Sequence, residues 1–157
     1  MRPVFDYPWL TLDLGHDMRV ISWAPHRGGI VTARHILWRE VRNADLTEDF
    51  DALAWLAQEC LDRGMERAGP VGDAAPARRA TYGTINVAVI LDHDLNDIGL
   101  IEAQSIASAA RTAAVLESGA MAQTGPATGT GTDCIAIAAR VGAEAFCGMH
   151  TAQGKAL

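Results

Sequence analysis

The sequence has few features of membrane or nucleic-acid-binding proteins. Among its 157 residues no apolar run is long enough to cross a bilayer, and Met1 to Leu10 lacks the charged and apolar regions of a signal peptide. The formal net charge of -6 argues against nucleic acid, because phosphate binding needs a clustered basic surface. We therefore expect a cytoplasmic protein that acts neither on nucleic acid nor at a membrane.

Cysteine and histidine are too scattered to indicate a disulfide framework or a metal site. The three cysteines show no Cys-x-x-Cys spacing and are predicted to be reduced core residues. The five histidines form no His-Glu-x-x-His pattern and have no paired cysteine. No metal is therefore expected, and Asp92-His93-Asp94 is predicted to be a solvated turn.

The composition instead favours one α/β domain over residues 1–157. Nearly half of the residues (49%) are hydrophobic, which is enough to build one core in a chain of this length. We predict a mixed β-sheet with two principal helices packed on it. The expected strands are 9–14 and 18–23, joined as a hairpin by Gly15-His16-Asp17, then 30–41, as one strand or a pair, and 84–91.

Capping residues and glycines mark the two helices. Thr47 is a typical N-cap for the first helix, and Gly64 ends it. Asn96 or Asp97 caps a second, alanine-rich helix that ends at Gly119. The inner residues expected for the second helix are Ile98, Ile101, Ile106, Ala110, Ala113 and Leu116.

A hairpin is also predicted near the C-terminus. Its strands are 134–139 and 143–147, and the three residues between them are too few for a parallel crossover. Counting the register places position 149 or 150 opposite Asp133, so His150 returns to that end. Together they would form a carboxylate-oriented imidazole that acts as a general base. The alternative is a capping aspartate and an exposed histidine, and spacing alone leaves both open.

Threonine and glycine alternate over residues 126–133, the Thr-Gly loop. If this segment is extended, the hydroxyls of Thr128, Thr130 and Thr132 share one face, and bare glycine backbone forms the other. The loop lacks the Gly-Lys-Ser/Thr ending of a mononucleotide loop and precedes a strand. It is suited to present N–H groups and hydroxyls to an oxyanion or a polar substrate, although a turn leading into a strand is the simpler alternative.

A second polar cluster, Gly83-Thr84-Ile85-Asn86, precedes the strand at 84–91. If Asn86 is buried, both ends of its amide need partners, which a substrate or the backbone could supply. The candidate substrate-binding residues in these two segments are Gly83, Thr84, Asn86, Thr128, Gly129, Thr130, Gly131 and Thr132.

Three motifs together resemble the adenosylcobinamide amidohydrolases. They are Gly83-Thr84-Ile85-Asn86, the run from Ala127 to Asp133, and the run from Gly148 to Gly154, and both order and spacing match. The resemblance extends from Tyr82 to Gly154. It adds Thr151 to the expected substrate-binding residues, and Gly28 and Gly29 resemble a glycine pair that the family carries near its start.

This resemblance implies a hydrolase of corrinoid salvage or remodelling. Water would cleave the amide that joins aminopropanol to the corrin rim of adenosylcobinamide, leaving adenosylcobyric acid. The corrinoid is then substrate or ligand, no resident cofactor is expected, and a homo-oligomer is left open. A surface of bare glycine backbone and hydroxyl groups suits a large flat ligand that carries amides around its rim.

The chain departs from the family pattern in three places. The family's long helix usually shows Thr-Glu-Ala-Lys where this chain has Ser108-Ala109-Ala110-Arg111, the connection before Tyr82 is short, and an asparagine expected near Trp38 is absent. These departures raise a second hypothesis, a corrinoid-binding relative without catalysis. A third is a hydrolase for a different amide or lactam.

Overall fold

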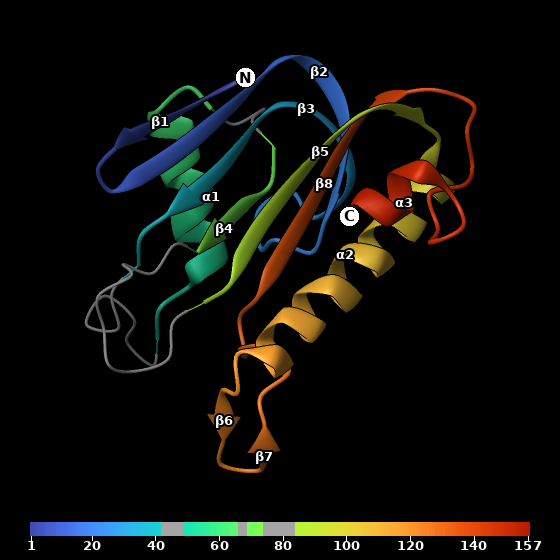
Figure 1. The fold of residues 1–157 in the computed structure, drawn as a ribbon. Coiled ribbons are helices and arrows are strands. Elements are labelled where there is room, and N and C mark those ends of the chain that lie inside the picture. The colour runs from blue at the N-terminus through green and yellow to red at the C-terminus, as the bar shows by residue number, and fades with distance from the viewer. Residues whose placement is uncertain (42–48, 66–68, 74–83) are drawn as a thin grey trace.

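The computed structural model describes residues 1–41, 49–65, 69–73 and 84–157. It shows a curled mixed β-sheet with the order β4-β3-β2-β8-β5, in which β1 also pairs with β2 (Figure 1). The strands of this sheet are β1 (Arg2–Asp6), β2 (Trp9–Ser22), β3 (Gly29–Arg39), β4 (Val71–Asp73), β5 (Asn86–Leu95) and β8 (Cys134–Val141).

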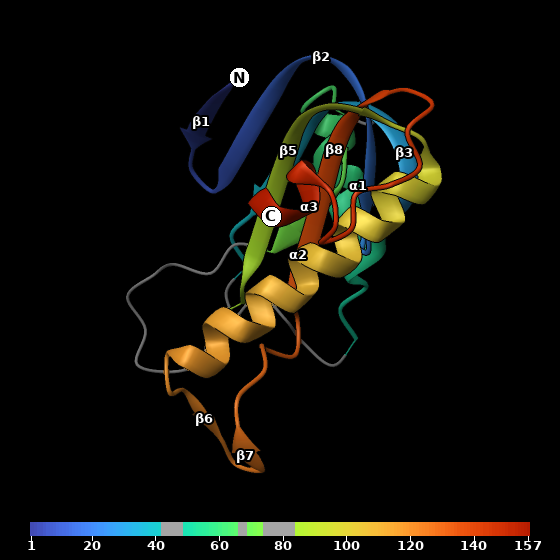
Figure 2. The same ribbon diagram turned by 45° about the vertical axis from the view of Figure 1, so that its right-hand side comes forward.

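Two substantial helices pack on this curled sheet, which confirms the predicted α/β class with two principal helices. In Figures 1 and 2, α2 runs across β5 and β8, and α1 lies against β3 at the other end of the curled sheet. The helices are α1 (Ala52–Asp62), α2 (Asp97–Glu117) and the short α3 (Ala152–Ala156). A small ribbon of β6 (Met121–Ala122) and β7 (Gly125–Pro126) extends beyond the end of α2. No helix in the described ranges is long and apolar enough to cross a membrane.

The β5-α2-β8 unit forms the centre of the fold. Strands β5 and β8 are parallel neighbours, with Asn86 opposite Cys134 and Ile90 opposite Ala138. On its other edge β8 pairs antiparallel with β2. Because β5 and β8 are parallel, one end of the pair gathers both strand starts and the other end gathers both strand finishes.

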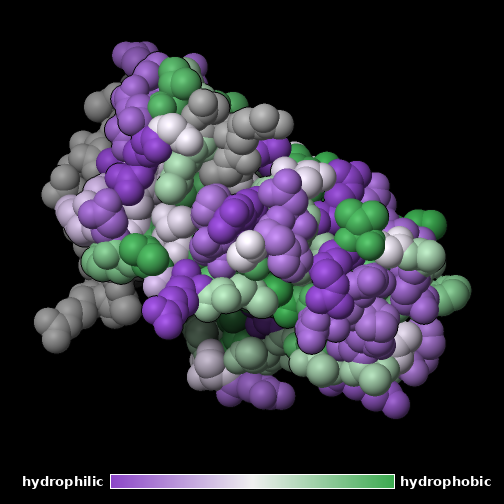
Figure 3. All heavy atoms as spheres, turned by 90° about the horizontal axis from the view of Figure 1, so that it is seen from above, coloured by the Kyte–Doolittle hydropathy of each residue, from purple (hydrophilic) through white to green (hydrophobic). Residues whose placement is uncertain are grey.

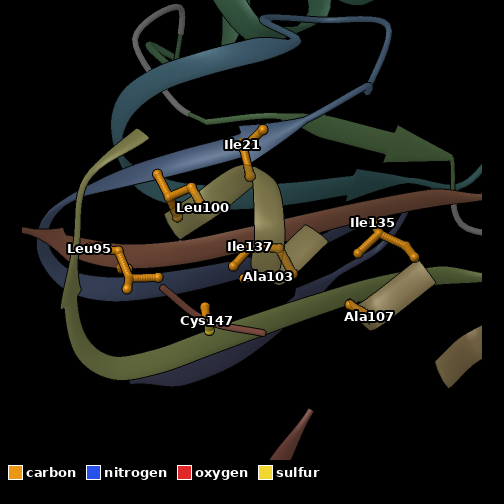
Figure 4. Close-up of a cluster of buried hydrophobic side chains, with 9 residues drawn as sticks. Ile21, Leu95, Leu100, Ala103, Ala107, Ile135, Ile137 and Cys147 are labelled. Carbon is orange, nitrogen blue, oxygen red and sulfur yellow. The ribbon is translucent and has the colours of Figure 1, made fainter. Parts of the chain in front are cut away.

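The core divides into clusters on the two faces of β8. Ile135 and Ile137 pack beneath α2 with Leu100 and Ala103 (Figure 4). The alternate residues of β8, including Ala136, face a second cluster on the other side of the sheet. A third cluster lies beneath α1 and consists of Trp9, Leu37, Leu56 and Cys60. Small side chains on α2 let the helix approach the sheet closely.

The predicted opening hairpin is wrong. Residues 9–22 form one strand, β2, whose pairing with β3 shifts register between Asp13 and Met18. Gly15 lies in this irregularity with a φ of 87°, and its amide donates to Asp13 Oδ1 at 2.8 Å. The glycine therefore bends a continuous strand rather than ending it. The true hairpin joins β1 to β2, and β1 has no counterpart among the strands predicted from the sequence.

The helix ends largely follow the sequence signals. Asn96 caps α2 by accepting from the Ile98 and Gly99 amides, as predicted. Gly64 and Gly119 follow the two helices with φ values of 64° and 72°. The first helix is capped by Asp51, which accepts from the Ala54 amide. Thr47 lies outside the described residues.

The predicted inner face of α2 is wrong. Ile98 and Ile101 are 65% and 54% exposed, whereas Leu100 and Ala103 are fully buried. Gly99 shows the reason, because a Cβ there would stand 2.9 Å from the Glu144 carbonyl oxygen. Close packing selects the glycine and alanine face, and the bulkier isoleucines point outwards.

The predicted turn at Asp92-His93-Asp94 is also wrong, because all three residues belong to β5. Arg140, on β8, donates to Asp94 at 2.6 Å and to Asp92 at 2.7 Å. The two acids therefore pair with the neighbouring strand.

The predicted C-terminal hairpin does not form. Residues 143–147 do not pair with β8, and Glu144 instead forms a parallel bridge with Leu95 at the end of β5. Gly142 permits this path, because a Cβ there would overlap the side chain of Asp94. The chain thus passes the end of β5 towards the start of α2 and carries His150 away from Asp133.

Neighbouring residues on α2 test this packing. Leu100→Ala should lower the free energy of unfolding by about 2–5 kcal/mol, because it opens a cavity in the core beneath the helix. Ile101→Ala, at an exposed position, should change it by less than about 0.5 kcal/mol. Urea unfolding of the two variants measures both values, and equal losses would contradict the observed orientation of α2.

Candidate active site

Asp133 is the hydrogen-bonding centre of the Thr-Gly loop. Its Oδ1 accepts from the Ile85 amide at 3.0 Å and from the Thr130 hydroxyl. Its Oδ2 accepts from the Thr130 amide at 2.8 Å and from Arg111 Nη1. A carboxylate has about four lone-pair sites, so these four donors occupy it fully. Asp133 joins the loop to β5 and α2 and retains no free acceptor for a reacting proton.

The charge of Asp133 is stabilised in this environment. Its side chain is only 5% exposed, and burial alone would raise its pKa. The hydrogen bonds from Thr130 and Ile85, with the charge of Arg111, outweigh burial and lower the pKa below its ordinary value. Asp133 is therefore an anion at neutral pH, held in place by its donors.

The Thr-Gly loop is not extended, so the expected row of hydroxyls on one face does not form. The residues before β8 follow bends and a turn. The Thr130 hydroxyl bonds to Asp133, the Thr132 hydroxyl bonds to the Thr84 hydroxyl, and Thr128 is exposed. These hydroxyls serve different partners, and two of them stabilise the loop itself.

The glycines of the loop also have different surroundings. A Cβ on Gly129 would overlap the Arg111 guanidinium, which donates to the Thr128 carbonyl oxygen at 3.0 Å. Gly131 has nothing within 4 Å of its Cβ position. The missing side chain at Gly129 therefore leaves room for Arg111. The missing side chain at Gly131 leaves space that a ligand could occupy.

A pocket of about 340 Å³ lies beside this loop. Its volume falls within the range of roughly 300–1,000 Å³ that is usual for small-molecule sites. Trp23 Nε1 donates to the Asp133 carbonyl oxygen at 2.6 Å and fixes one wall. This amino-end pocket, named for the strand starts of β5 and β8, is lined by Trp23, Pro25, Gly131, Thr132, Asp133 and Cys134.

Asn86 lies next to the pocket, opposite Cys134 in the parallel register. Both its amide nitrogen and its amide oxygen are buried, and neither has a partner among the described residues. A buried amide group without a hydrogen bond costs about 1–3 kcal/mol, so a molecule that paired with Asn86 would remove this cost.

The other predicted substrate-binding residues are distributed unequally. Thr84 lies at the amino end through its bond to Thr132. Gly29 begins β3 opposite Ser22, and Gly28 approaches the Ala24 carbonyl so closely that a Cβ would stand 2.6 Å from its oxygen. This loop thus reaches the same end of the sheet as Trp23, while Gly83 lies outside the described residues.

Cys134 contributes a thiol to the pocket wall. Its Sγ lies 3.2 Å from the Ser22 hydroxyl, and burial raises its pKa above the ordinary value despite that hydrogen bond. A protonated, buried thiol is a poor nucleophile. The predicted role of Cys134 as a reduced core residue fits these surroundings.

His150 lies at the opposite end of β8, among the finishes of the parallel strands. The eight residues of β8 span roughly 26 Å at about 3.3 Å per residue. The predicted pairing of Asp133 with His150 is therefore wrong, because it depended on a hairpin that the chain does not form. His150 is exposed, and its ring packs edge-to-face on Phe146 at 6.0 Å between centroids.

A different carboxylate lies near His150. Glu102, on α2, accepts from the Cys147 amide through Oε2 at 2.6 Å. A Cβ built on Gly148 would stand 2.6 Å from Glu102 Oε1 and 3.0 Å from His150 Nδ1. Both side chains thus face the bare side of Gly148. We name Glu102, Cys147, Gly148 and His150 the carboxyl-end cluster.

Thr151 belongs to the framework of this cluster. Its hydroxyl donates to the Gly148 carbonyl oxygen at 2.8 Å and accepts from the Gly154 amide at 3.0 Å. A Cβ on Gly154 would overlap that same carbonyl. The motif from Gly148 to Gly154 is therefore a tight turn that holds His150 in place. The two hydrogen bonds of the Thr151 hydroxyl stabilise this turn.

Sequence reasoning missed Glu102, Arg111 and Trp23. Each acts through a contact between elements distant in the sequence. Glu102 and Trp23 stand in none of the motifs, and Arg111 stands out only as the arginine at the lysine position of the family's helix motif. Within the described ranges no three His, Cys, Asp or Glu side chains gather as a metal site. Viewed from above, the surface shows hydrophobic patches separated by hydrophilic atoms rather than one apolar face (Figure 3).

The fold and these contacts define a small α/β domain with a ligand-sized pocket at one end of a parallel strand pair and a histidine–carboxylate cluster at the other. The model of the Adenosylcobinamide amidohydrolase family matches residues 62–157. The chain belongs to this family, which confirms the resemblance carried by the three motifs. No curated protein and no solved structure matches the chain.

Asp133→Asn tests the role of Asp133 in the loop. It should lower the free energy of unfolding by about 3 kcal/mol at pH 7, because the Arg111 charge loses its buried partner. Since folding lowers the pKa of Asp133, its contribution is complete above the unfolded value of about 3.9. It is lost as the pH falls through the lower folded value.

Urea unfolding over this pH range gives the measurement. The wild-type protein and Asp133→Asn should converge only in acid, and the exposed Thr128→Ala should behave as the wild type at every pH. A constant difference between the wild-type protein and Asp133→Asn down to the lowest pH would contradict the assignment.

Proposed function

We propose that this protein hydrolyses the amide that joins aminopropanol to the corrin rim of adenosylcobinamide or cobinamide, giving the corresponding cobyric acid. The observation that carries the proposal is the family match over residues 62–157. That stretch contains the Thr-Gly loop, Asn86 and the whole carboxyl-end cluster. Adenosylcobinamide amidohydrolase is the description of the matched family, and amide hydrolysis is the reaction that we infer from it.

His150 is the group best suited to activate water. Its imidazole is exposed to substrate, and the turn around Thr151 holds its backbone. A water molecule would give its proton to the imidazole as its oxygen adds to the amide carbon. The C–N bond would then break, the proton would pass to the departing amine, and a carboxylate would remain.

The place of His150 also agrees with the architecture. In sheets with parallel strands, ligands usually bind outside the carboxyl ends, where β5 and β8 finish beside the start of α2. Exposed Phe146 and Met149 offer apolar contact beside the imidazole. Asp133, whose acceptors are all occupied, would contribute by holding the Thr-Gly loop rather than as a base.

Replacement of His150 tests this role. His150→Ala should reduce hydrolysis about 10²- to 10⁴-fold and leave corrinoid affinity within about tenfold, because a base acts mainly on the transition state. Formation of adenosylcobyric acid, followed by liquid chromatography and mass spectrometry, gives the rate. The matched control is His16→Ala, an exposed histidine in the bulge of β2. Unchanged turnover in His150→Ala would exclude His150 as the base.

A second candidate function is corrinoid binding without hydrolysis. The amide of Asn86, which has no partner among residues 84–157 or the other described ranges, favours it, because such an amide pairs well with the carboxamides at a corrinoid rim. The exposed Ala109 also favours it, because the family usually carries a glutamate at this helix position. Binding would then use the amino-end pocket, at the other end of the parallel strand pair from His150.

Asn86→Leu distinguishes this candidate by two effects of opposite sign. Removal of an unpaired buried amide should raise the free energy of unfolding by about 1 kcal/mol. The same change should weaken cobinamide binding by at least about tenfold, because the ligand loses its amide partner. Urea unfolding and a visible-spectrum titration with cobinamide measure the two effects. Wild-type protein that gives no spectral change, or a variant with undiminished affinity, counts against binding at Asn86.

A further inference from the structure

The carboxylate of Glu102 has one oxygen that accepts a backbone hydrogen bond and one that lies on the same side of Gly148 as the His150 ring. Oε2 accepts from the Cys147 amide at 2.6 Å, which fixes the side chain against the turn. Oε1 forms no hydrogen bond with the described residues and lies on the bare side of Gly148, the side that His150 Nδ1 also faces. Glu102 is partly buried and projects from the first turns of α2, so it comes from a rigid element.

Gly148 makes this approach between the two side chains possible. Any Cβ at this position would stand 2.6 Å from Glu102 Oε1 and 3.0 Å from His150 Nδ1. Both distances are shorter than a Cβ ordinarily tolerates, and a methyl group would separate the carboxylate from the imidazole. The glycine keeps the space between them free for a single bridging water.

We propose that Glu102 is the positioning residue for His150. Its carboxylate accepts from a water molecule that in turn accepts from the Nδ1–H of the imidazole, and so leaves Nε2 unprotonated and directed to solvent. This inference rests on the proposed function, because it names the group that prepares the base for amide hydrolysis. It replaces the Asp133–His150 pair expected from the sequence with a pair that the fold brings together.

A carboxylate is suited to this task because a neutral imidazole has two tautomers. In the absence of a partner the proton is shared between the two nitrogens, and only the form with a free Nε2 can accept a proton from water there. An acceptor beside Nδ1 selects that form and also stabilises the imidazolium after the transfer.

Glu102→Gln in two backgrounds tests the assignment. Glutamine preserves the acceptor for the Cys147 amide and removes the charge facing His150. In the wild-type background kcat should fall about ten- to a hundredfold, as is usual when the partner that orients a functional histidine is lost, and KM should change less than about threefold. In the His150→Ala background the same change should have no further effect.

Glu144→Gln is the matched control. Glu144 lies in the same segment, and its Oε1 likewise accepts a backbone amide, that of Phe146, at 2.9 Å. This variant should retain wild-type kcat. A loss in Glu102→Gln that persists in the His150→Ala background would overturn the proposal, because Glu102 would then act through the turn alone. Unchanged kcat in Glu102→Gln would also overturn it.

The tautomer of His150 gives a readout that does not require turnover. Long-range ¹H–¹⁵N spectra at a pH where His150 is neutral should show the proton mainly on Nδ1 in the wild-type protein and mainly on Nε2 in Glu102→Gln. The same tautomer in both would overturn the assignment even if hydrolysis is observed. If wild-type protein gives no adenosylcobyric acid but the tautomer changes as expected, the proposed function fails and the Glu102–His150 contact stands.

Discussion

The structure depends above all on the full occupation of one buried carboxylate. Asp133 stands where α2, the start of β5 and the Thr-Gly loop meet, and each of these segments donates to it. An anion in such a place is stable only when its acceptors are all used. The composition of the loop follows from this requirement, because Thr130 supplies two donors and Gly129 leaves room for Arg111.

The parallel pairing of β5 and β8 then divides the functional residues between two ends. Residues that precede the strands collect around the amino-end pocket, and those that follow them collect around Gly148. The three family motifs therefore lie at two separate places in the fold. The third motif holds a histidine in a tight turn, whereas the first two surround a pocket and a buried asparagine.

Local signals predicted much of this fold. The Asn96 cap and the glycines after both helices act through neighbouring residues, so these helix ends can be predicted from the sequence alone. Pairings that depend on distant contacts could not be predicted in this way. Gly142 resembles part of a turn, but it lets the chain leave the sheet past Asp94, and that path separates His150 from Asp133. No pattern in the sequence around Glu102 predicts that its side chain lies beside Gly148.

The residues around Asp133 and the residues around Gly148 have no side chain in common, and this has an evolutionary consequence. If hydrolysis takes place around Gly148 and binding around Asn86, as proposed, substitutions that abolish hydrolysis leave the contacts of Asp133 intact, so they need not compromise folding or binding. Selection can therefore act on turnover and on recognition as separate traits. A lineage could discard the first and keep the second within an unchanged scaffold.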